Sequence, residues 1–260
     1  MRHEDGSAGD ADYGRIGQSY SSYRQPDPRI AAMISEALGP AGTVLNVGAG
    51  AGSYEPLDRE VTAVEPSASM RAQRPSHLAP AIDATAEHLP FADDSFDAAM
   101  ASFTIHQWAD LEAGLREVRR VTRGPVVILT CDPLEVETFW LNDYAPKVLS
   151  TEAKRYPSFE RVAEGLGTSI DRIAVPIPLD CRDGFNEAYY GRPEMLLEPA
   201  ARLSCSAWSF VTPDEANTAV AHLAADLKSG AWDSKHGALR QQPAYVGSLY
   251  LLVSSGKTNL

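Results

Sequence analysis

Residues 43–52 read TVLNVGAGAG, and this stretch decides the fold of the chain. Apart from Asn46, residues 43–47 are apolar or β-branched, which is typical of a buried parallel strand. Gly48, Gly50 and Gly52 follow at alternate positions. Glycine allows a sharp backbone turn and lets a ligand approach the backbone amides. The stretch therefore predicts a central strand that runs into a ligand-binding loop.

The spacing of these glycines separates two kinds of nucleotide cofactor. A dinucleotide site has a third glycine three residues after the second, and a helix whose N-terminus holds the pyrophosphate. Here position 53 is Ser53, and the Tyr54-Glu55-Pro56 run that follows leaves little room for a long helix. The G-x-G-x-G spacing instead resembles motif I of the class I S-adenosylmethionine (SAM)-dependent methyltransferases. An NAD-dependent oxidoreductase is the less favoured alternative.

The next predicted strand, in residues 60–66 (EVTAVEP), ends in an acid. A carboxylate at the tip of this strand can accept hydrogen bonds from both hydroxyls of an adenosine ribose. We therefore predict that Glu65, with Pro66 beside it, binds the cofactor. An exposed acid at a strand end is the alternative interpretation.

A second motif lies beyond the predicted third strand and its loop, residues 79–89. Residues 86–91 read AEHLPF, and Ser95-Phe96-Asp97 follows. The pair resembles the A-E-x-L-P-F…S-F-D signature of the methyltransferase subfamily that contains the ubiquinone and menaquinone C-methyltransferases. The resemblance covers residues 20–133 and the final strand. It implies a doubly wound, seven-stranded Rossmann-like α/β sheet with an antiparallel last strand, SAM as cofactor and S-adenosylhomocysteine as product.

The chain departs from that subfamily at two positions. Thr85 stands where an acid often binds the adenine amine, and Asp83 is a second candidate for that contact. Asn46 stands where motif I usually has Asp or Glu. Ahead of the first predicted helix, Arg24 and Tyr20 could bind the methionine carboxylate, or could lie on an ordinary amphipathic helix. The residues predicted to bind SAM are Tyr20, Arg24, Asn46, Gly48, Ala49, Gly50, Glu65, Pro66, Thr85, Ala86, Glu87 and Ser102.

The predicted fourth strand, residues 96–102, continues as FTIHQWAD in residues 103–110. Ligands of open α/β sheets bind at the carboxyl ends of strands, so His106 is a candidate general base or substrate orienter. It could equally pack within the loop, because methyl transfer to a nucleophilic atom needs chiefly alignment. Asp132 follows the predicted fifth strand and could contact the acceptor or cap a helix. The residues predicted to contact the acceptor are Tyr23, Thr104, Asp132, Trp140, Tyr144 and Tyr189.

Three segments are predicted along the chain. Residues 1–12 are rich in Gly and Asp and are predicted to be a disordered tail. Residues 13–133 and 243–256 are predicted to form the SAM-binding core. Residues 134–242 mix aromatic and charged side chains, and are predicted to be a helical insertion that carries the sixth strand and covers the acceptor. A helical subdomain held together by its aromatic side chains is the alternative.

Composition narrows the partners. The 260 residues carry a net charge of -12, which repels a nucleic-acid backbone. The 3 cysteines are too scattered for a disulfide framework, and no metal site is expected. No apolar run approaches the ~20 residues of a membrane helix, so a cytoplasmic monomer or homodimer is expected. The sequence thus predicts a SAM-dependent methyltransferase that acts on an O, N or C nucleophile of a small molecule. A specialised metabolite is one such acceptor. A SAM-binding cyclase or other non-methylating relative is the alternative.

Overall fold

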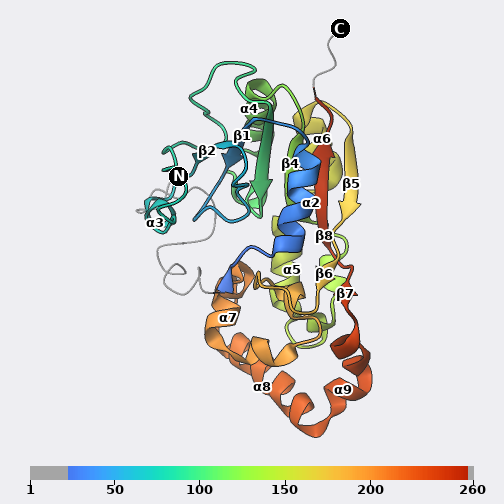
Figure 1. The fold of residues 1–260 in the computed structure, drawn as a ribbon. Helices are drawn as coiled ribbons and strands as arrows, with labels where there is room; N and C mark the ends of the chain where they lie inside the picture. The colour runs from blue at the N-terminus through green and yellow to red at the C-terminus, as the bar shows by residue number, and fades with distance from the viewer. Residues whose placement is uncertain (1–22, 257–260) are drawn as a thin grey trace.

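The run at residues 43–47 forms β1 (Thr43–Val47), the strand at which the winding of the sheet reverses (Figure 1). The computed structural model describes residues 23–256. In it β2 (Glu60–Val64) lies on one side of β1 and β3 (Ala98–Ser102) on the other, both parallel to β1. β1 is therefore the strand at which the chain passes from one half of the sheet to the other. In such sheets, ligands bind in the crevice outside the carboxyl end of this strand.

The main sheet has six strands in the order β2-β1-β3-β4-β8-β5. The remaining strands are β4 (Val126–Cys131), β5 (Ile170–Ala174), β6 (Ile177–Pro178), β7 (Ala244–Tyr245) and β8 (Leu249–Ser254). β6 and β7 form a separate antiparallel pair. The predicted doubly wound Rossmann-like architecture with an antiparallel last strand is confirmed.

Helices cover both faces of the sheet. The α-helices are α2 (Pro28–Leu38), α3 (Ala68–Ala72), α4 (Leu111–Val121), α5 (Pro146–Arg155), α6 (Phe159–Leu166), α7 (Pro199–Leu203), α8 (Pro213–Ser229) and α9 (Ala231–His236). Short 3₁₀ helices are η1 (Ile105–Gln107), η2 (Val136–Thr138), η3 (Trp140–Asp143), η4 (Asn186–Tyr189), η5 (Pro193–Leu197), η6 (Ser206–Phe210) and η7 (Gly237–Gln241). Apolar residues of α2 pack on one face of the sheet, and those of α4 and α6 pack on the other.

The main sheet has six strands and not the expected seven, because the predicted third strand does not form. Residues 79–89 do not join the sheet as a named strand, and only Ile82 bridges to Val64 of β2. Two hydrogen bonds hold it there, from Glu65 N–H to the Ile82 carbonyl and from Ile82 N–H to the Ala63 carbonyl. Pro80 precedes this bridge and Pro90 follows it, and neither has an N–H to extend the pairing.

The predicted sixth and seventh strands are each divided. Pro176 separates β5 from β6, because a proline cannot donate to a strand ladder. Residues 246–248 separate β7 from β8. The alternating apolar pattern of residues 244–254 would also suit an antiparallel edge strand, but β8 lies between β4 and β5 and is antiparallel to both. β5, with its partly exposed side chains, forms the edge.

Local sequence explains where α2 begins and ends. The Asp27 carboxylate accepts a hydrogen bond from the Arg29 backbone N–H, and Pro28 takes the first helical position. Gly39, with a φ of 61°, ends the helix. The first predicted helix is thereby confirmed, and it begins at the Asp27-Pro28 pair.

Residues 134–242 contribute to two regions. α6 packs against α4, and β5 extends the sheet. α7, α8 and α9 gather at one end of the molecule (Figure 1). Within residues 23–256 no helix is both long enough and apolar enough to cross a bilayer. The predicted tail, residues 1–12, lies outside the described residues.

Candidate active site

The loop after β1 has a backbone that requires glycine. Gly48, Gly50 and Gly52 have φ values of 68°, 52° and 93°, which side chains of L-residues rarely accommodate. A Cβ on Gly48 would lie 2.0 Å from the Thr104 Oγ1 atom, and a Cβ on Gly52 would lie 2.3 Å from Leu78 Cδ1. The predicted ligand-binding loop is therefore tightly packed from behind, with glycine at the points of closest approach.

Glu65 lies at the carboxyl end of β2 with its carboxylate fixed on both sides. The Gly50 N–H donates to Oε2 at 2.8 Å, and the Ser67 N–H donates to Oε1 at 2.8 Å. The Glu65 carbonyl accepts from Arg71 Nη1 at 2.7 Å. The side chain is therefore held against the glycine loop.

The glycine loop and Glu65 line a cleft that is open to solvent, and about 900 Å³ of empty space lies in it and in its mouth. Within the described residues, every side chain or loop residue predicted to bind SAM lines this cleft, and Tyr20 lies outside the described residues. The cleft is lined by Arg24, Asn46, Gly48, Ala49, Gly50, Ala51, Ser53, Tyr54, Glu65, Pro66, Met70, Thr85, Ala86, Glu87, Ser102, Phe103, Thr104, Gln107 and Trp108.

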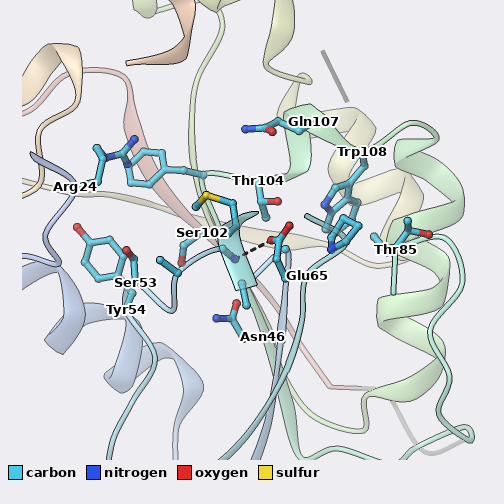
Figure 2. A pocket seen from close by; sticks show the side chains of 18 of the residues that line it. Arg24, Asn46, Ser53, Tyr54, Glu65, Thr85, Ser102, Thr104, Gln107 and Trp108 are labelled. Carbon is cyan, nitrogen blue, oxygen red and sulfur yellow. Dashed lines mark hydrogen bonds between the residues drawn. The ribbon is translucent and has the colours of Figure 1, made fainter. Parts of the chain in front are cut away.

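Figure 2 shows how these side chains divide the cleft. Arg24 and Tyr54 lie on one side, Thr85 and Trp108 lie on the other, and Glu65 lies between them. Gly114 of α4 lets Trp108 pack closely, since a Cβ there would lie 2.5 Å from Trp108 Cε3. The Trp108 side is thus an aromatic wall, and the Arg24 side is polar.

Asn46 connects the cleft to a buried ion pair. Its side-chain amide donates to Glu55 Oε1 at 2.9 Å. Arg74 donates to both oxygens of the same carboxylate, Nη1 to Oε1 and Nη2 to Oε2, each at 2.9 Å. The Arg74 and Glu55 side chains are 4% and 2% exposed, so the contact is fully desolvated. An amide at position 46 suits a neighbouring carboxylate, which explains the departure from the Asp or Glu of motif I.

Arg24 joins the N-terminal side of the cleft to the 134–242 segment. Its Nε donates to Asp183 Oδ1 at 2.5 Å, and its guanidinium lies 4.9 Å from the centre of the Phe103 ring. The Tyr54 hydroxyl donates to Asp183 Oδ2 at 2.9 Å. Burial, together with the charge of Asp183, raises the pKa of Tyr54 well above its usual range, so its hydroxyl stays protonated.

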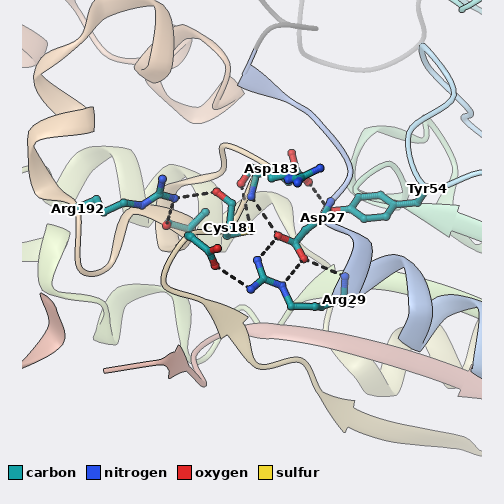
Figure 3. Close-up of polar contacts among 9 residues, drawn as sticks. Asp27, Arg29, Tyr54, Cys181, Asp183 and Arg192 are labelled. Carbon is teal, nitrogen blue, oxygen red and sulfur yellow. Dashed lines mark hydrogen bonds and ion pairs between the residues drawn. The ribbon is translucent and has the colours of Figure 1, made fainter. Parts of the chain in front are cut away.

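Asp27 extends this polar network (Figure 3). Its carboxylate pairs with Arg29 at 2.8 Å and accepts from the Arg182 backbone N–H at 3.2 Å. Burial opposes ionisation of Asp27, but the hydrogen bonds from Arg29 and Arg182 outweigh it and lower the pKa to about 2. The start of α2 is thus connected to residues 182 and 183.

Comparisons with known proteins find a family match in the part of the chain that forms most of this cleft. Residues 45–128 match a family model described as a methyltransferase domain. Residues 45–128 therefore form a methyltransferase domain of the class I SAM-dependent type. The family implies the use of SAM.

Three relatives of this methyltransferase domain are informative. The demethylmenaquinone methyltransferase of Mycolicibacterium paratuberculosis is 35% identical over 108 residues, 40% of this chain and 47% of that protein. The malonyl-[acyl-carrier protein] O-methyltransferase of Pseudescherichia vulneris is 35% identical over 130 residues, 46% of this chain and 51% of that protein. The match thus spans about half the length of these curated relatives.

A crystal structure matches over a greater length. It is a protein of Anabaena variabilis that is assigned as a methyltransferase from an antibiotic biosynthesis pathway. The superposition has a TM-score of 0.83 with 29% identity, and covers 90% of this chain and 100% of the other. The similarity to a methyltransferase therefore extends through most of residues 134–242 as well as through the cofactor cleft.

His106 lies beside the methyltransferase cleft and does not line it. Its ring packs 4.7 Å from the Tyr156 ring, centre to centre. Burial, with smaller contributions from the charges of Arg155 and Arg24, lowers the pKa of His106 well below its usual range. His106 Nε2 lies 3.4 Å from the side-chain nitrogen of Gln107, which does line the cleft. His106 is therefore a neutral imidazole that lies behind the wall of the cleft.

Of the residues predicted to contact the acceptor, Thr104 lines the cleft. The Asp132 Oδ1 atom accepts from the Leu134 N–H at 2.9 Å and closes a turn. Trp140 donates from Nε1 to the Tyr190 carbonyl at 3.0 Å, and the Tyr144 hydroxyl donates to Asp226 at 2.9 Å. These two side chains are buried, so the structure does not bring them to this cleft.

Tyr189 and Tyr23 also stand away from the cleft lining. Tyr189 is buried below the Arg192 guanidinium, which lies 5.6 Å from the centre of its ring. Tyr23 packs at the edge of the core cluster that contains Tyr189, and its carbonyl accepts from the Gly184 N–H at 2.8 Å. Asp83, the second candidate for adenine, is exposed, pairs with Arg71 at 3.3 Å, and does not line the cleft.

Several lining residues were not predicted from the sequence. Tyr54 and Phe103 have positive φ values, 65° and 53°, and nothing in a tyrosine or phenylalanine signals that conformation in advance. Glu55 and Arg74 meet across 19 positions of chain. Trp108 was not predicted either, although a signal was available, because the His-Gln-Trp run that contains it follows the fourth predicted strand.

Proposed function

We propose that this chain transfers the SAM methyl group to an O, N or C nucleophile of a small-molecule acceptor. The observation that supports this most strongly is the Glu65 carboxylate, fixed by the Gly50 and Ser67 N–H groups beside a loop of three glycines. A hydrogen-bond acceptor in that position suits the two ribose hydroxyls of an adenosine cofactor. S-adenosylhomocysteine is the expected product.

The shape and chemistry of the cleft fit SAM. Glu65 would hold the ribose, and residues 85–87 with Trp108 would hold the adenine. A guanidinium has five N–H donors, so Arg24 can bind the methionine carboxylate while Asp183 keeps it oriented. Tyr20 would assist Arg24. The absence of a helix between β1 and β2 disfavours a dinucleotide, whose pyrophosphate needs a helix N-terminus.

SAM supplies a methyl group that is already electrophilic because it is bonded to a sulfonium. The residues of the chain therefore have to orient the acceptor and exclude water. Ser102 and Thr104 lie at the carboxyl end of β3, where an acceptor would approach. His106 would act through Gln107 as an orienter, and as a base only after a movement that exposes it to the cleft.

Residues 134–242 would cover the acceptor. The Arg24–Asp183 ion pair connects this segment to the cleft, which supports the proposal that it acts as a lid. The predicted acceptor residues that do not line the cleft would then shape the lid and the path by which the acceptor enters. They are Tyr23, Asp132, Trp140, Tyr144 and Tyr189. A specialised metabolite is the kind of acceptor suggested by the Anabaena variabilis relative, which is assigned to an antibiotic biosynthesis pathway.

Calorimetric titration of the full chain with SAM, S-adenosylhomocysteine and NAD tests the cofactor. We expect binding of the first two and none of NAD, and a loss of about tenfold or more in SAM affinity in Glu65→Ala. Glu60→Ala, an exposed acid on the same strand, is the matched control. Equal SAM affinity in Glu65→Ala and wild type would overturn the assignment of the site. Methyl transfer is then followed by mass spectrometry with a panel of acceptors, which separates a methyltransferase from a non-methylating SAM-binding relative.

A further inference from the structure

A second, narrower cavity adjoins the cleft. Phe103 is the residue that the linings of the two have in common. The cavity is small, with room for about one group the size of a water molecule, and lies at the carboxyl end of β4, where Cys131 forms part of its wall. Its polar lining comes from Glu152, Tyr156, Asn186, Glu187 and Ser248.

Both glutamates of this cavity are held in place by neutral donors. Each Glu187 oxygen lies within hydrogen-bond distance of the Ser248 N–H, at 3.0 and 3.1 Å. Glu152 Oε2 accepts from Asn186 Nδ2 at 2.7 Å. The Asn186 carbonyl oxygen in turn accepts from Trp208 Nε1 at 3.0 Å. Asn186 is therefore held with its amide nitrogen toward Glu152.

Among residues 23–256, neither Glu152 nor Glu187 forms an ion pair within 4.0 Å. The charges of Arg155 and Arg24 favour the ionised form of Glu152, but burial outweighs them. The nearby guanidinium of Arg24 is paired with Asp183, and that of Arg155 donates to Ser206. Burial, and for Glu187 also the charge of Glu152, raises the pKa of both glutamates, that of Glu187 to about 7.

A buried carboxylate is costly unless a positive charge or several donors compensate it. Here the hydrogen-bond partners of both carboxyl groups are neutral, Asn186 and Tyr156 for Glu152 and Ser248 for Glu187, and the two groups face one cavity. A cation in the cavity would thus be attracted to both carboxyl groups, whereas an anion would be repelled.

The remaining walls also suit a cation. Phe103, Tyr156 and Phe185 place aromatic rings around the cavity, and the Phe103 and Phe185 rings are 5.4 Å apart, centre to centre. The faces of aromatic rings attract cations. The cavity is narrow, so a compact group such as an ammonium fits it better than a guanidinium or a phosphate.

We propose that this cavity binds the ammonium group of a small amine-bearing acceptor, with Glu152 and Glu187 as its counter-charges and Phe103 between it and the cofactor cleft. The inference rests on the proposed function, because it assigns the amine to the molecule that receives the methyl group. The rest of the acceptor would extend past Phe103 toward Ser102 and Thr104.

Two matched probes test the proposal on the full chain, saturated with S-adenosylhomocysteine. Benzylamine and benzyl alcohol have nearly the same shape and differ in charge at neutral pH. Ligand-detected NMR titration should show that benzylamine binds about tenfold or more tightly than benzyl alcohol. Glu152→Gln and Glu187→Gln keep the size of each side chain, and each should remove most of that preference. Glu137→Gln, which alters an exposed acid outside this cavity, should leave it unchanged.

The outcomes separate this inference from the proposed function. Equal or no binding of the two probes, or an unchanged preference in both glutamine variants, would overturn the amine site even if S-adenosylhomocysteine still binds. Failure of the wild type to bind S-adenosylhomocysteine would instead overturn the proposed function. Thermal unfolding of the glutamine variants serves as the folding control, and we expect melting temperatures no lower than that of wild type at pH 8.

Discussion

Asn46 donates its side-chain amide to Glu55 at 2.9 Å, at the position where motif I of the family usually carries an acid. Arg74 already uses both oxygens of the Glu55 carboxylate. An acid at position 46 would therefore place a second carboxylate against the first, with no additional cation to compensate it. The amide at position 46 and the acid at position 55 form a matched pair.

Asn46→Asp should lower the free energy of unfolding by about 2–4 kcal/mol, because it creates a buried like-charge contact. Urea unfolding at pH 7 measures the loss. The double variant Asn46→Asp/Glu55→Gln exchanges the amide and the acid, and should recover part of it. A double variant that shows only the sum of the two single losses would mean that the two side chains are not coupled.

Gly48→Ala should be far more harmful than Gly167→Ala. Both glycines have positive φ values, 68° and 66°, so both variants carry the left-handed strain of about 1–2 kcal/mol. Only at Gly48 would the added Cβ collide with a neighbour, at 2.0 Å from Thr104 Oγ1, since nothing lies within 4 Å of a Cβ on Gly167. Unfolding free energy and SAM affinity, measured for both variants, check this prediction. Equal losses of stability in the two variants would show that backbone strain alone explains the requirement for glycine at position 48.

Asp27→Asn should reduce stability at pH 7 by about 1–2 kcal/mol, because Asp27 caps α2 and pairs with Arg29. The Asp27 pKa of about 2 lies below the ordinary value of 3.8, so its contribution is present above pH 4 and is lost as the pH falls toward 2. The difference between wild type and Asp27→Asn should therefore shrink between pH 7 and pH 3 in urea unfolding. A difference that is constant with pH would contradict the assignment.

Glu187→Gln should stabilise the protein at pH 8. The pKa of Glu187, raised by burial from 4.5 to about 7, means that the folded state binds the proton more tightly than the unfolded chain. The wild type therefore loses stability as the pH rises from about 4.5 to 7, by up to about 3 kcal/mol, and the glutamine variant does not. Glu152, Glu135, Tyr156 and Cys131 are the other titrating groups around this site, and Arg24 and Arg155 supply the nearby positive charge.

Thermal unfolding of wild type and Glu187→Gln at pH 5 and pH 8 measures this effect. The gain in melting temperature should be larger at pH 8 than at pH 5. If the variant is less stable at both values, the hydrogen bond to the Ser248 N–H matters more than the buried charge.

The local parts of the fold could be predicted from the sequence. Consecutive residues encode β1, the glycine loop and Glu65, and their hydrogen bonds join neighbours such as Gly50 and Glu65. The start of α2 follows from a similarly short signal, the Asp27-Pro28 pair. This is why the predicted cofactor residues within the described part of the chain line one cleft.

The long-range parts could not be predicted in this way. The Arg24–Asp183 pair joins residues 159 positions apart, and no periodicity reveals it. The third strand was expected because residues 79–89 look extended, but their prolines prevent them from pairing along their length. Trp140 and Tyr144 were assigned to the acceptor by composition, and the structure buries them among other aromatic side chains. Aromatic residues alone do not distinguish a core from a binding surface.

The position of β8 between β4 and β5 has a consequence for synthesis of the chain on the ribosome. β4 ends at Cys131 and can pair with β3 on one side, but its other edge has no partner until residues 249–254 have been made. β5 ends at Ala174 and pairs with β8 alone in the main sheet, so it waits for the same residues. At about 5–20 residues per second, the edges of these strands wait several seconds for the strand that pairs with them. Helical packing by α4 and α6 has to protect this half of the sheet until then, so the nascent chain should depend on chaperones most strongly during that interval.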